Sequence, residues 1–124
     1  MNILDSSAWL EYFADTKNAG NFSKIIENTK DLIVPTITIY EVFKKVLQKK
    51  DRKKATETIA YMKQGKIVDL NLNLSLEAVK LNMKYNLPMT DSIILATAKQ
   101  YNATVWTQDA DFKGIPGVKY FKKI

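Results

Sequence analysis

Residues Asp91–Asp109 read DSIILATAKQYNATVWTQD and predict a helix followed by a short strand, with an acid at each end. The first part is apolar almost all round, which is typical of a deeply buried helix. Thr90 is its predicted N-terminal cap, and Asn102 suits a left-handed residue just after its end. Residues 103–106 are apolar and partly β-branched, as in a buried parallel strand. Because a carboxylate on a buried element is costly without a partner, this stretch points to a cation.

Short apolar strands alternate with helices along the whole chain. Strands are predicted at residues 2–4, 31–35, 66–70, 103–106 and 118–121. This order predicts an α/β fold of three layers, α/β/α, around a central parallel sheet of four to five strands. Two helices fall between the second and third strands, so a helical hairpin is expected to stand off the sheet. No linker or repeat divides the sequence, and residues 1–124 are expected to form a single domain.

Two further predictions concern which side chains are buried. A helix is expected to begin at Ser75 and to turn Leu76, Val79 and Met83 towards the core, because these residues recur at helical spacing. Four tyrosines also lie at helical spacing beside apolar residues, which favours a core position over stacking on nucleic-acid bases. They are Tyr40, Tyr61, Tyr85 and Tyr101.

The composition excludes several classes of chemistry. The chain has no cysteine and no histidine, which rules out disulfides, zinc sites built on thiolate or imidazole, and Ser-His-Asp or Cys-His catalysis. No apolar run approaches the ~18 residues of a membrane span, and the N-terminus lacks the pattern of a signal peptide. We therefore expect a cytoplasmic protein without a membrane partner, whose chemistry uses carboxylates, lysines, tyrosines or hydroxyls.

Four acids are the candidate catalytic residues. Asp5 and Asp109 follow predicted strands, whereas Glu41 and Asp91 lie in the first turns of predicted helices. In open α/β sheets ligands bind beyond the carboxyl ends of the strands, where all four can meet. Crowded carboxylates repel one another unless protons or cations neutralise them. A set of oxygen ligands suits Mg²⁺ or Mn²⁺, and such an ion can activate water for attack on a phosphodiester.

Each of these acids also has a purely structural explanation. Asp5 and Asp109 can form turns at strand ends, and Asp91 suits the positive end of a helix dipole. Glu41 completes the pattern Thr38-x-x-Glu41 of a capping box. The four explanations are independent of one another, and they do not account for the joint pattern.

The charge of the chain favours a polyanionic partner. The formal net charge is +6, from 19 basic and 13 acidic residues. Basic side chains crowd the break between the two central helices, at Lys44, Lys45, Lys49, Lys50, Arg52, Lys53 and Lys54. They are candidate substrate-binding residues that contact RNA phosphates. A solvated tip of a helical hairpin explains them equally well.

These motifs resemble the PIN-domain family, and more narrowly the VapC toxins of prokaryotic toxin–antitoxin pairs. The resemblance rests on Asp5-Ser6-Ser7, the helical Glu41, Asp91-x-x-Ile-x-Ala-x-Ala and Thr107-x-Asp109-x-Asp111-Phe112. It implies a Mg²⁺-dependent endoribonuclease, with Mn²⁺ able to substitute, that cuts RNA such as tRNA or rRNA. It also implies a VapB-like antitoxin partner and a homodimer.

The resemblance assigns roles to individual residues. Asp5, Asp91 and Asp109 match the family's metal ligands, and Glu41 completes its catalytic acids. Ser6 or Thr107 is implied as polar support, and the role of Asp111 as a ligand stays open.

Three other functions remain open at this stage. The first is a PIN-domain RNase that processes RNA outside a toxin–antitoxin pair. The second is a phospho-receiver domain with Asp69 as the acceptor and Thr107 as the switch hydroxyl, although a receiver is expected to carry a second acid where Ser6 follows Asp5. The third is an RNA-binding scaffold without turnover, which the four intact acids argue against.

Overall fold

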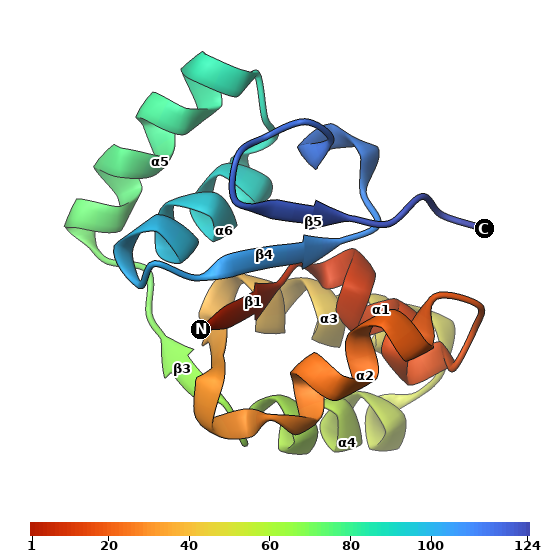
Figure 1. Cartoon of the computed structure of the whole chain (residues 1–124). Coiled ribbons are helices and arrows are strands. Elements are labelled where there is room, and N and C mark those ends of the chain that lie inside the picture. The colour runs from red at the N-terminus through yellow and green to blue at the C-terminus, as the bar shows by residue number, and fades with distance from the viewer.

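Five parallel strands form the centre of the structure, a computed structural model that describes residues 1–124 (Figure 1). They are β1 (Asn2–Leu4), β2 (Leu32–Pro35), β3 (Lys66–Val68), β4 (Thr104–Thr107) and β5 (Val118–Tyr120). Their order in the sheet is β3-β2-β1-β4-β5, and every neighbouring pair is parallel. The order therefore reverses between β1 and β4, which places a ligand-binding edge beyond the carboxyl ends of these two strands.

Helices cover both faces of this sheet, so the predicted three-layer α/β/α class is confirmed. The helices are α1 (Ser6–Ala14), α2 (Ala19–Glu27), α3 (Thr36–Lys49), α4 (Arg52–Met62), α5 (Leu72–Tyr85) and α6 (Met89–Gln100). Two short 3-10 turns, η1 (Thr29–Asp31) and η2 (Ala110–Phe112), complete the chain. No helix is both long and apolar enough to span a membrane.

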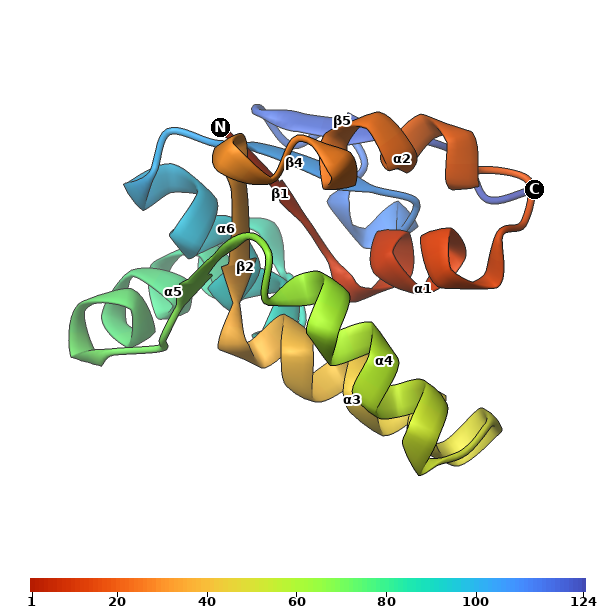
Figure 2. The same ribbon diagram turned by 90° about the horizontal axis from the view of Figure 1, so that it is seen from below.

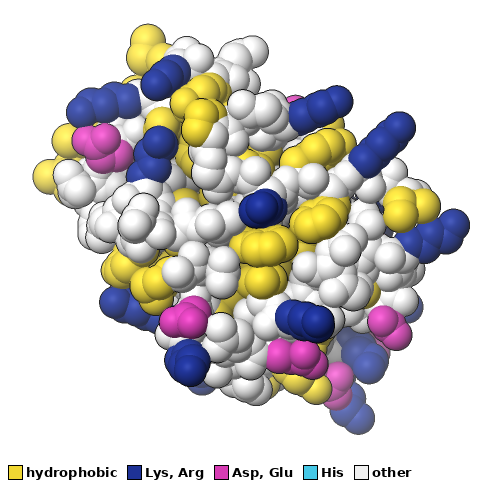
Figure 3. Space-filling model, in the orientation of Figure 1, with side chains coloured by type: hydrophobic (Ala, Val, Ile, Leu, Met, Phe, Trp, Pro, Cys, Tyr) yellow, Lys and Arg dark blue, Asp and Glu magenta, His cyan; other side chains and the backbone are white.

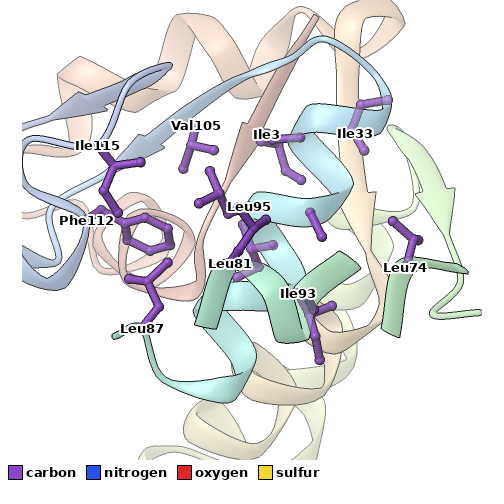
Figure 4. Packing of buried hydrophobic residues seen from close by; sticks show 14 of the residues in the cluster. Ile3, Ile33, Leu74, Leu81, Leu87, Ile93, Leu95, Val105, Phe112 and Ile115 are labelled. Atoms are coloured by element: carbon purple, nitrogen blue, oxygen red, sulfur yellow. The ribbon is translucent and has the colours of Figure 1, made fainter. Parts of the chain in front are cut away.

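Alternate side chains of each strand feed two separate cores, as the pleat of a strand dictates. Ile3, Ile33 and Val105 face α5 and α6 in the first core (Figure 4). Leu4 and Val34 face the other way and pack with residues of α1, α2, α3 and α4. The two cores leave β1 and β2 covered on both sides, which explains their continuous apolar sequence.

Helix α6 is buried along its central two turns. Every residue from Asp91 to Ala98 is buried, as its apolar sequence predicted. Its end is also as predicted, because Asn102 adopts a left-handed conformation with φ 51°. The predicted cap is wrong: the helix begins at Met89 after Pro88, so Thr90 lies inside the first turn. Proline suits the start of a helix because it has no N–H group, and the first N–H groups of a helix have no partner within the helix.

The side of α5 that faces the core was predicted wrongly. Leu76, Val79 and Met83 are exposed, whereas Leu74 and Leu81 are buried. Both sets recur at helical spacing, so periodicity alone does not choose between them. The buried stripe also contains the small side chain Ala78, which lets α5 approach α6 closely. The helix begins earlier than Ser75, because the Asn71 side chain caps it by accepting a hydrogen bond from the Leu74 N–H (2.9 Å).

Helices α3 and α4 form the predicted hairpin, which projects away from the sheet (Figure 2). Asp51 caps α4 by accepting a hydrogen bond from the Lys54 N–H at 2.8 Å. At the base of the hairpin, a Cβ atom on Gly65 would lie 2.8 Å from Val34 Cγ2 and 3.0 Å from the Leu32 carbonyl oxygen. Glycine is therefore required where the chain turns back to form β3 beside β2.

The predicted burial of the tyrosines is only half right. Tyr85 and Tyr101 pack against the first core, as expected. Tyr40 and Tyr61 are exposed, on α3 and α4 respectively. A helix pair that projects from the sheet exposes more of its surface to solvent than it buries. A prediction from helical spacing beside apolar residues therefore overestimates the burial of side chains on α3 and α4.

Candidate metal centre

Asp5 stands at the carboxyl end of β1, and three hydrogen-bond donors hold its carboxylate. Its Oδ1 accepts a bond from the Ala8 N–H (3.1 Å), which makes Asp5 the N-terminal cap of α1. The Ser7 hydroxyl lies 2.8 and 2.9 Å from the two carboxylate oxygens. The Thr107 hydroxyl donates to Oδ2 at 2.7 Å. Asp5 therefore does have a structural role, as the cap of α1 and not as the predicted turn residue, and the same contacts fix its carboxylate at the sheet edge.

Asp109 follows β4, the neighbour of β1. Its N–H donates to the Thr107 hydroxyl oxygen at 2.9 Å, so Thr107 touches both Asp5 and Asp109. Asp109 Oδ1 accepts a hydrogen bond from the Asp111 N–H (2.9 Å), which begins the turn η2. The side chain of Asp111 is itself exposed. Asp109 is thus a cap, as its structural explanation required, and it also lies at the predicted edge.

Asp91 lies in the first turn of α6 and is buried. One carboxylate oxygen from each of Asp5, Asp91 and Asp109 lies within 4.8 Å of the other two. The structure therefore brings together three of the four predicted acids, from β1, β4 and α6. We call these three residues the acidic triplet.

Glu41 stands on α3, outside the acidic triplet. Its Oε1 is buried and has no hydrogen-bond partner, and its negative charge contributes to the raised pKa of Asp91. The predicted capping box is wrong, because Thr38 is already inside the helix, and its buried hydroxyl has no partner. Glu41 therefore has no structural role as a cap, and its unpaired Oε1 belongs to a side chain whose charge acts on Asp91.

The electrostatics of the site disfavour ionised carboxylates. Burial raises the pKa of Asp5 to about 6, although hydrogen bonds from Thr107, Ser7 and Ala8 oppose the rise. Burial also raises the pKa of Asp91 to about 8, helped by the negative charges of Asp109, Asp5 and Glu41. A buried carboxyl among other carboxylates keeps its proton because nothing positive stabilises the charge.

The donor set fits a hard divalent cation. All candidate ligands are carboxylate oxygens, the chemistry that Mg²⁺ and Mn²⁺ prefer. No lysine or arginine neutralises the triplet, since the two ion pairs of the protein, Lys54–Glu57 and Lys80–Glu77, lie on the surfaces of α4 and α5. The unpaired Glu41 oxygen supplies a fourth acceptor beside the triplet. Asp5, Asp91, Asp109 and Glu41 are therefore the residues that could hold the ion.

A groove of about 1140 Å³ runs between α1 and the α3–α4 hairpin. Ser6 and Ser7, the neighbours of Asp5, are part of its lining. Four of the seven predicted basic residues also line it, namely Lys45, Lys49, Lys50 and Lys54. The other three, Lys44, Arg52 and Lys53, are exposed but do not line it. We call this feature the basic groove. No member of the acidic triplet lines it, but Ser6, Ser7 and Gln108, the chain neighbours of Asp5 and Asp109, do.

Sequence reasoning missed two groups of residues at the site. Ser7, and not the predicted Ser6, contacts the Asp5 carboxylate. The only sequence signal for Ser7 was its place in Asp5-Ser6-Ser7. Glu11, Asn18 and Gln108 form a hydrogen-bonded group next to Ser7. Nothing in the sequence signalled this group, because its members are distant along the chain and common residue types.

Solved structures similar to this one include toxin and toxin–antitoxin proteins. A chain of a toxin–antitoxin complex from Klebsiella pneumoniae is 24% identical with a TM-score of 0.83, and 100% of each chain is covered. VapC20 from Mycobacterium tuberculosis, a sarcin–ricin loop cleaving toxin, is 12% identical with a TM-score of 0.77, covering 95% of this chain and 97% of the other. VapBC2 from Rickettsia felis, bound to promoter DNA, is 16% identical with a TM-score of 0.73, covering 97% and 96%.

At these identities the similarity establishes the fold. A comparison with curated proteins gives no significant match. The family model described as PIN domain matches residues 3–118, which is nearly the whole chain and includes the acidic triplet and Glu41. The chain therefore belongs to the PIN-domain family.

Proposed function

We propose that this protein is a metal-dependent endoribonuclease and the toxin of a VapBC-type toxin–antitoxin pair. The observation that carries the proposal is the acidic triplet, in which three carboxylates from β1, β4 and α6 approach within 4.8 Å without any basic partner. Asp5 and Asp109 have structural roles as caps, but a stable fold does not require the buried Asp91 carboxyl beside them, because a buried acid without a partner is destabilising. Membership of the PIN-domain family supports the same reading.

The proposed cofactor is Mg²⁺, which Mn²⁺ can replace, held by Asp5, Asp91 and Asp109. When bound, the ion supplies the positive charge that promotes attack of water on a phosphodiester. Thr107 and Ser7 hold the carboxylate of Asp5 in one orientation. Asp91 would have to be ionised to hold the ion, since metal ligands are deprotonated. Glu41 accepts a proton or a hydrogen bond at Oε1, which has no other partner.

The proposed reaction leaves defined ends on the RNA. Water attacks phosphorus, the bond between phosphorus and the 3′ oxygen breaks, and the products carry a 5′-phosphate and a 3′-hydroxyl. Attack by the ribose 2′-hydroxyl would leave a 2′,3′-cyclic phosphate instead. The chain has no histidine to exchange protons with a 2′-hydroxyl, which favours water as the nucleophile.

We propose that single-stranded RNA runs along the basic groove to the acidic triplet. Lys45, Lys49, Lys50 and Lys54 would contact its phosphates. Phe13 and Tyr61 also line the groove and pack edge to face, with ring centroids 6.0 Å apart. An exposed tyrosine in such a groove can stack on a base.

The proposed protein partner is a VapB-like antitoxin. Its support is the set of similar structures, two of which are a toxin–antitoxin complex and a VapBC complex. An antitoxin should be encoded by a short reading frame that overlaps or adjoins the gene of this protein. Co-expression of that frame should restore the growth of cells that make this protein.

We also propose a homodimer, formed through the outer face of α5. Leu72, Leu76, Val79 and Met83 are 76%, 58%, 55% and 79% exposed and form one apolar stripe. Figure 3 shows hydrophobic side chains reaching the surface at the edge where α5 lies. Their spacing of four, three and four residues reads the same in both directions. A two-fold axis can therefore set Leu72 opposite Met83 and Leu76 opposite Val79.

Specific interfaces bury at least ~1,000 Å² in total, so the proposed dimer must pair the apolar stripes of both copies along the length of α5. Leu76→Lys should therefore convert a dimer to a monomer in light-scattering mass measurements. Leu47→Lys, at another exposed leucine on α3, is the matched control and should leave the mass unchanged. A monomeric wild type at micromolar concentration would refute the dimer.

The alternative functions have less support. Asp69 follows the edge strand β3, is exposed and does not belong to the acidic triplet, and the Thr107 hydroxyl is bound to Asp5. Both observations disfavour a phospho-receiver. A PIN-domain RNase outside a toxin–antitoxin pair would use the same site, so only a growth experiment separates it from a toxin.

That experiment tests the proposed function directly. Expression of the wild-type chain alone should stop bacterial growth, whereas Asp5→Ala should not. Purified protein should cut RNA with Mg²⁺ or Mn²⁺ and leave 5′-phosphate ends. RNA cutting without growth arrest would favour an RNase outside a toxin–antitoxin pair. Cyclic-phosphate ends, or cutting that persists in EDTA, would refute the mechanism, and RNA binding without cutting would favour a scaffold.

A further inference from the structure

Glu11, Asn18 and Gln108 form a group of hydrogen-bonded side chains that we call the polar clamp. Asn18 Nδ2 donates to Gln108 Oε1 at 2.9 Å, and Gln108 Nε2 donates to Glu11 Oε1 at 3.0 Å. The Asn18 N–H donates to Glu11 Oε2 at 2.8 Å, which closes the ring. Asn18 and Gln108 are both buried, and each carboxylate oxygen of Glu11 has a donor.

The polar clamp joins two neighbouring segments near the N-terminus to two segments near the C-terminus. Glu11 lies on α1, Asn18 precedes α2, and Gln108 follows β4. Asn18 Nδ2 also donates to the Lys122 carbonyl oxygen at 3.0 Å, which adds the segment after β5. Figures 1 and 2 both place this C-terminal segment beside the loop between α1 and α2.

Gln108 stands between two residues of the candidate site. Thr107 before it donates to Asp5, and Asp109 after it belongs to the acidic triplet. The Gln108 N–H is directed at the Ser7 hydroxyl at 3.4 Å, and its Nε2 at the Ser7 carbonyl oxygen at 3.5 Å. The last backbone bond of β4 here joins the Phe121 N–H to the Thr107 carbonyl oxygen at 2.9 Å. Beyond it, side-chain contacts of Gln108 hold the segment that carries Asp109.

Stability alone does not explain a buried glutamine here. An amide and a carboxylate taken out of water cost free energy unless all their hydrogen bonds are remade. A fully satisfied polar network makes its members rigid and fixes one geometry. Metal ligands need that property, because a ligand displaced by about 0.5 Å binds poorly.

We propose that Gln108 is a positioning residue for the metal site, and that Glu11 and Asn18 hold it in place. The clamp sets the exit of the chain from β4 and thereby places Thr107 and Asp109 against Asp5. This inference rests on the proposed metal-dependent function. It assigns a role at the site to three residues that are not members of the acidic triplet.

The test compares Mn²⁺ affinity, measured by calorimetry, with thermal stability measured in EDTA. Gln108→Met keeps the size of the side chain and removes its donors and acceptor. We expect it to weaken Mn²⁺ binding about 10- to 100-fold, as loss of residues that support metal ligands does. Asn71→Ala is the control for lost stability, since it removes the cap of α5. It should lower the melting temperature and leave Mn²⁺ affinity unchanged.

An exchange of the two partners provides a stricter test. Gln108→Glu alone sets a carboxylate oxygen against Glu11 Oε1 and should weaken Mn²⁺ binding at least as much as Gln108→Met. The double variant Glu11→Gln with Gln108→Glu reverses the donor and the acceptor, so every bond of the ring can form again. Its Mn²⁺ affinity should return to within a few-fold of the wild type.

Each outcome decides between the two proposals. Tight Mn²⁺ binding by the wild type, with equal binding by Gln108→Met, would overturn the positioning role and leave the proposed function intact. Equal losses of Mn²⁺ affinity in Gln108→Met and Asn71→Ala would also overturn the positioning role, because reduced stability would then explain the loss in each variant. No Mn²⁺ binding by the folded wild type would overturn both proposals. Failure of Gln108→Glu to fold leaves Gln108→Met and the exchanged pair to decide.

Discussion

The Thr107 hydroxyl donates a 2.7 Å hydrogen bond to Oδ2 of Asp5. The two residues are far apart in sequence but follow the adjacent strands β1 and β4, between which the strand order reverses. The same Thr107 oxygen accepts the N–H of Asp109 at 2.9 Å. One hydroxyl group therefore sets the relative positions of two members of the acidic triplet.

Loss of this hydroxyl should damage the site more than the fold. Thr107→Val keeps the shape of the side chain but removes a bond that opposes the rise in the pKa of Asp5. We expect Mn²⁺ affinity and RNA cleavage to fall about 10- to 100-fold. Thr107→Ser, which keeps the hydroxyl, should retain most of both. Equal activity in the valine and wild-type proteins would contradict the role of Thr107.

Asp91→Asn should separate stability from function. Asp91 is buried beside other carboxylates, which destabilise its ionised form. The amide removes that charge, so the melting temperature in EDTA at pH 8 should stay equal or rise, while cleavage should be abolished. Both quantities are measured on the same preparation. A marked loss of stability in this variant would instead indicate that the carboxylate has a structural role.

The metal-free protein should lose stability as the pH rises. An aspartate of the unfolded chain ionises near pH ~3.9, whereas the pKa is raised to about 6 for Asp5 and about 8 for Asp91 in the fold. Between these values the folded chain binds more protons than the unfolded chain, so the free energy of unfolding falls. This contribution is fully present below about pH 4 and lost by about pH 8.

Thermal unfolding in EDTA at pH 5 and pH 8 measures this dependence. The wild type should melt at a lower temperature at pH 8, and Asp91→Asn should show a smaller difference between the two values. Mn²⁺ added at pH 8 should raise the wild-type melting temperature, because an ion that binds only the folded state stabilises it. A wild type that is no less stable at pH 8 would count against the buried, unpaired acids.

The candidate site could be predicted from the sequence to a large extent, because strand ends impose strong rules. Asp5 and Asp109 follow apolar strands, and parallel strands deliver such residues to one edge. The direction of α5 was not predictable, since Leu74 and Leu76 fit helical spacing equally well. The polar clamp was not predictable either, because contacts between Asn18 and Gln108 depend on the packing of α1 against β4.

The basic groove should determine how RNA affinity depends on salt. Changing Lys45, Lys49, Lys50 and Lys54 to glutamine in an Asp5→Asn background gives a protein that should bind without cutting. Each lost phosphate contact lowers the slope of log affinity against log salt by about 0.7 for single strands, so four contacts predict a loss of up to about 3. Filter binding of a single-stranded RNA at several salt concentrations measures the slope.

The control for this experiment changes the same number of charges elsewhere. Lys24, Lys30, Lys80 and Lys84 are exposed and do not line the groove. Their replacement by glutamine should leave most of the slope intact. Similar slopes for the two quadruple variants would show that net charge, and no particular surface, attracts RNA.

Gly65 tests the packing at the base of the hairpin, and Gly20 serves as its control. Gly65→Ala should destabilise the protein by about 1–3 kcal/mol, because its Cβ would press on Val34 and the Leu32 carbonyl. Gly20→Ala, on α2, meets nothing within 4 Å, and should stabilise the protein by about 0.4–1 kcal/mol. Denaturant unfolding of both variants measures the two values, which should have opposite signs.

The projecting α3–α4 hairpin and the helix α6 should differ in local stability. The tip of the hairpin, around Asp51, has exposed side chains and is held by the cap of α4. The acidic triplet, by contrast, includes Asp91 at the start of the buried stretch of α6. Backbone amides near the tip should exchange quickly with deuterated solvent, through local opening. Those in the buried part of α6 should exchange much more slowly, because they become accessible only when the whole protein unfolds. The α3–α4 hairpin, which forms one wall of the basic groove, can then move to admit ligands of different width. The carboxylates of the acidic triplet keep their spacing meanwhile.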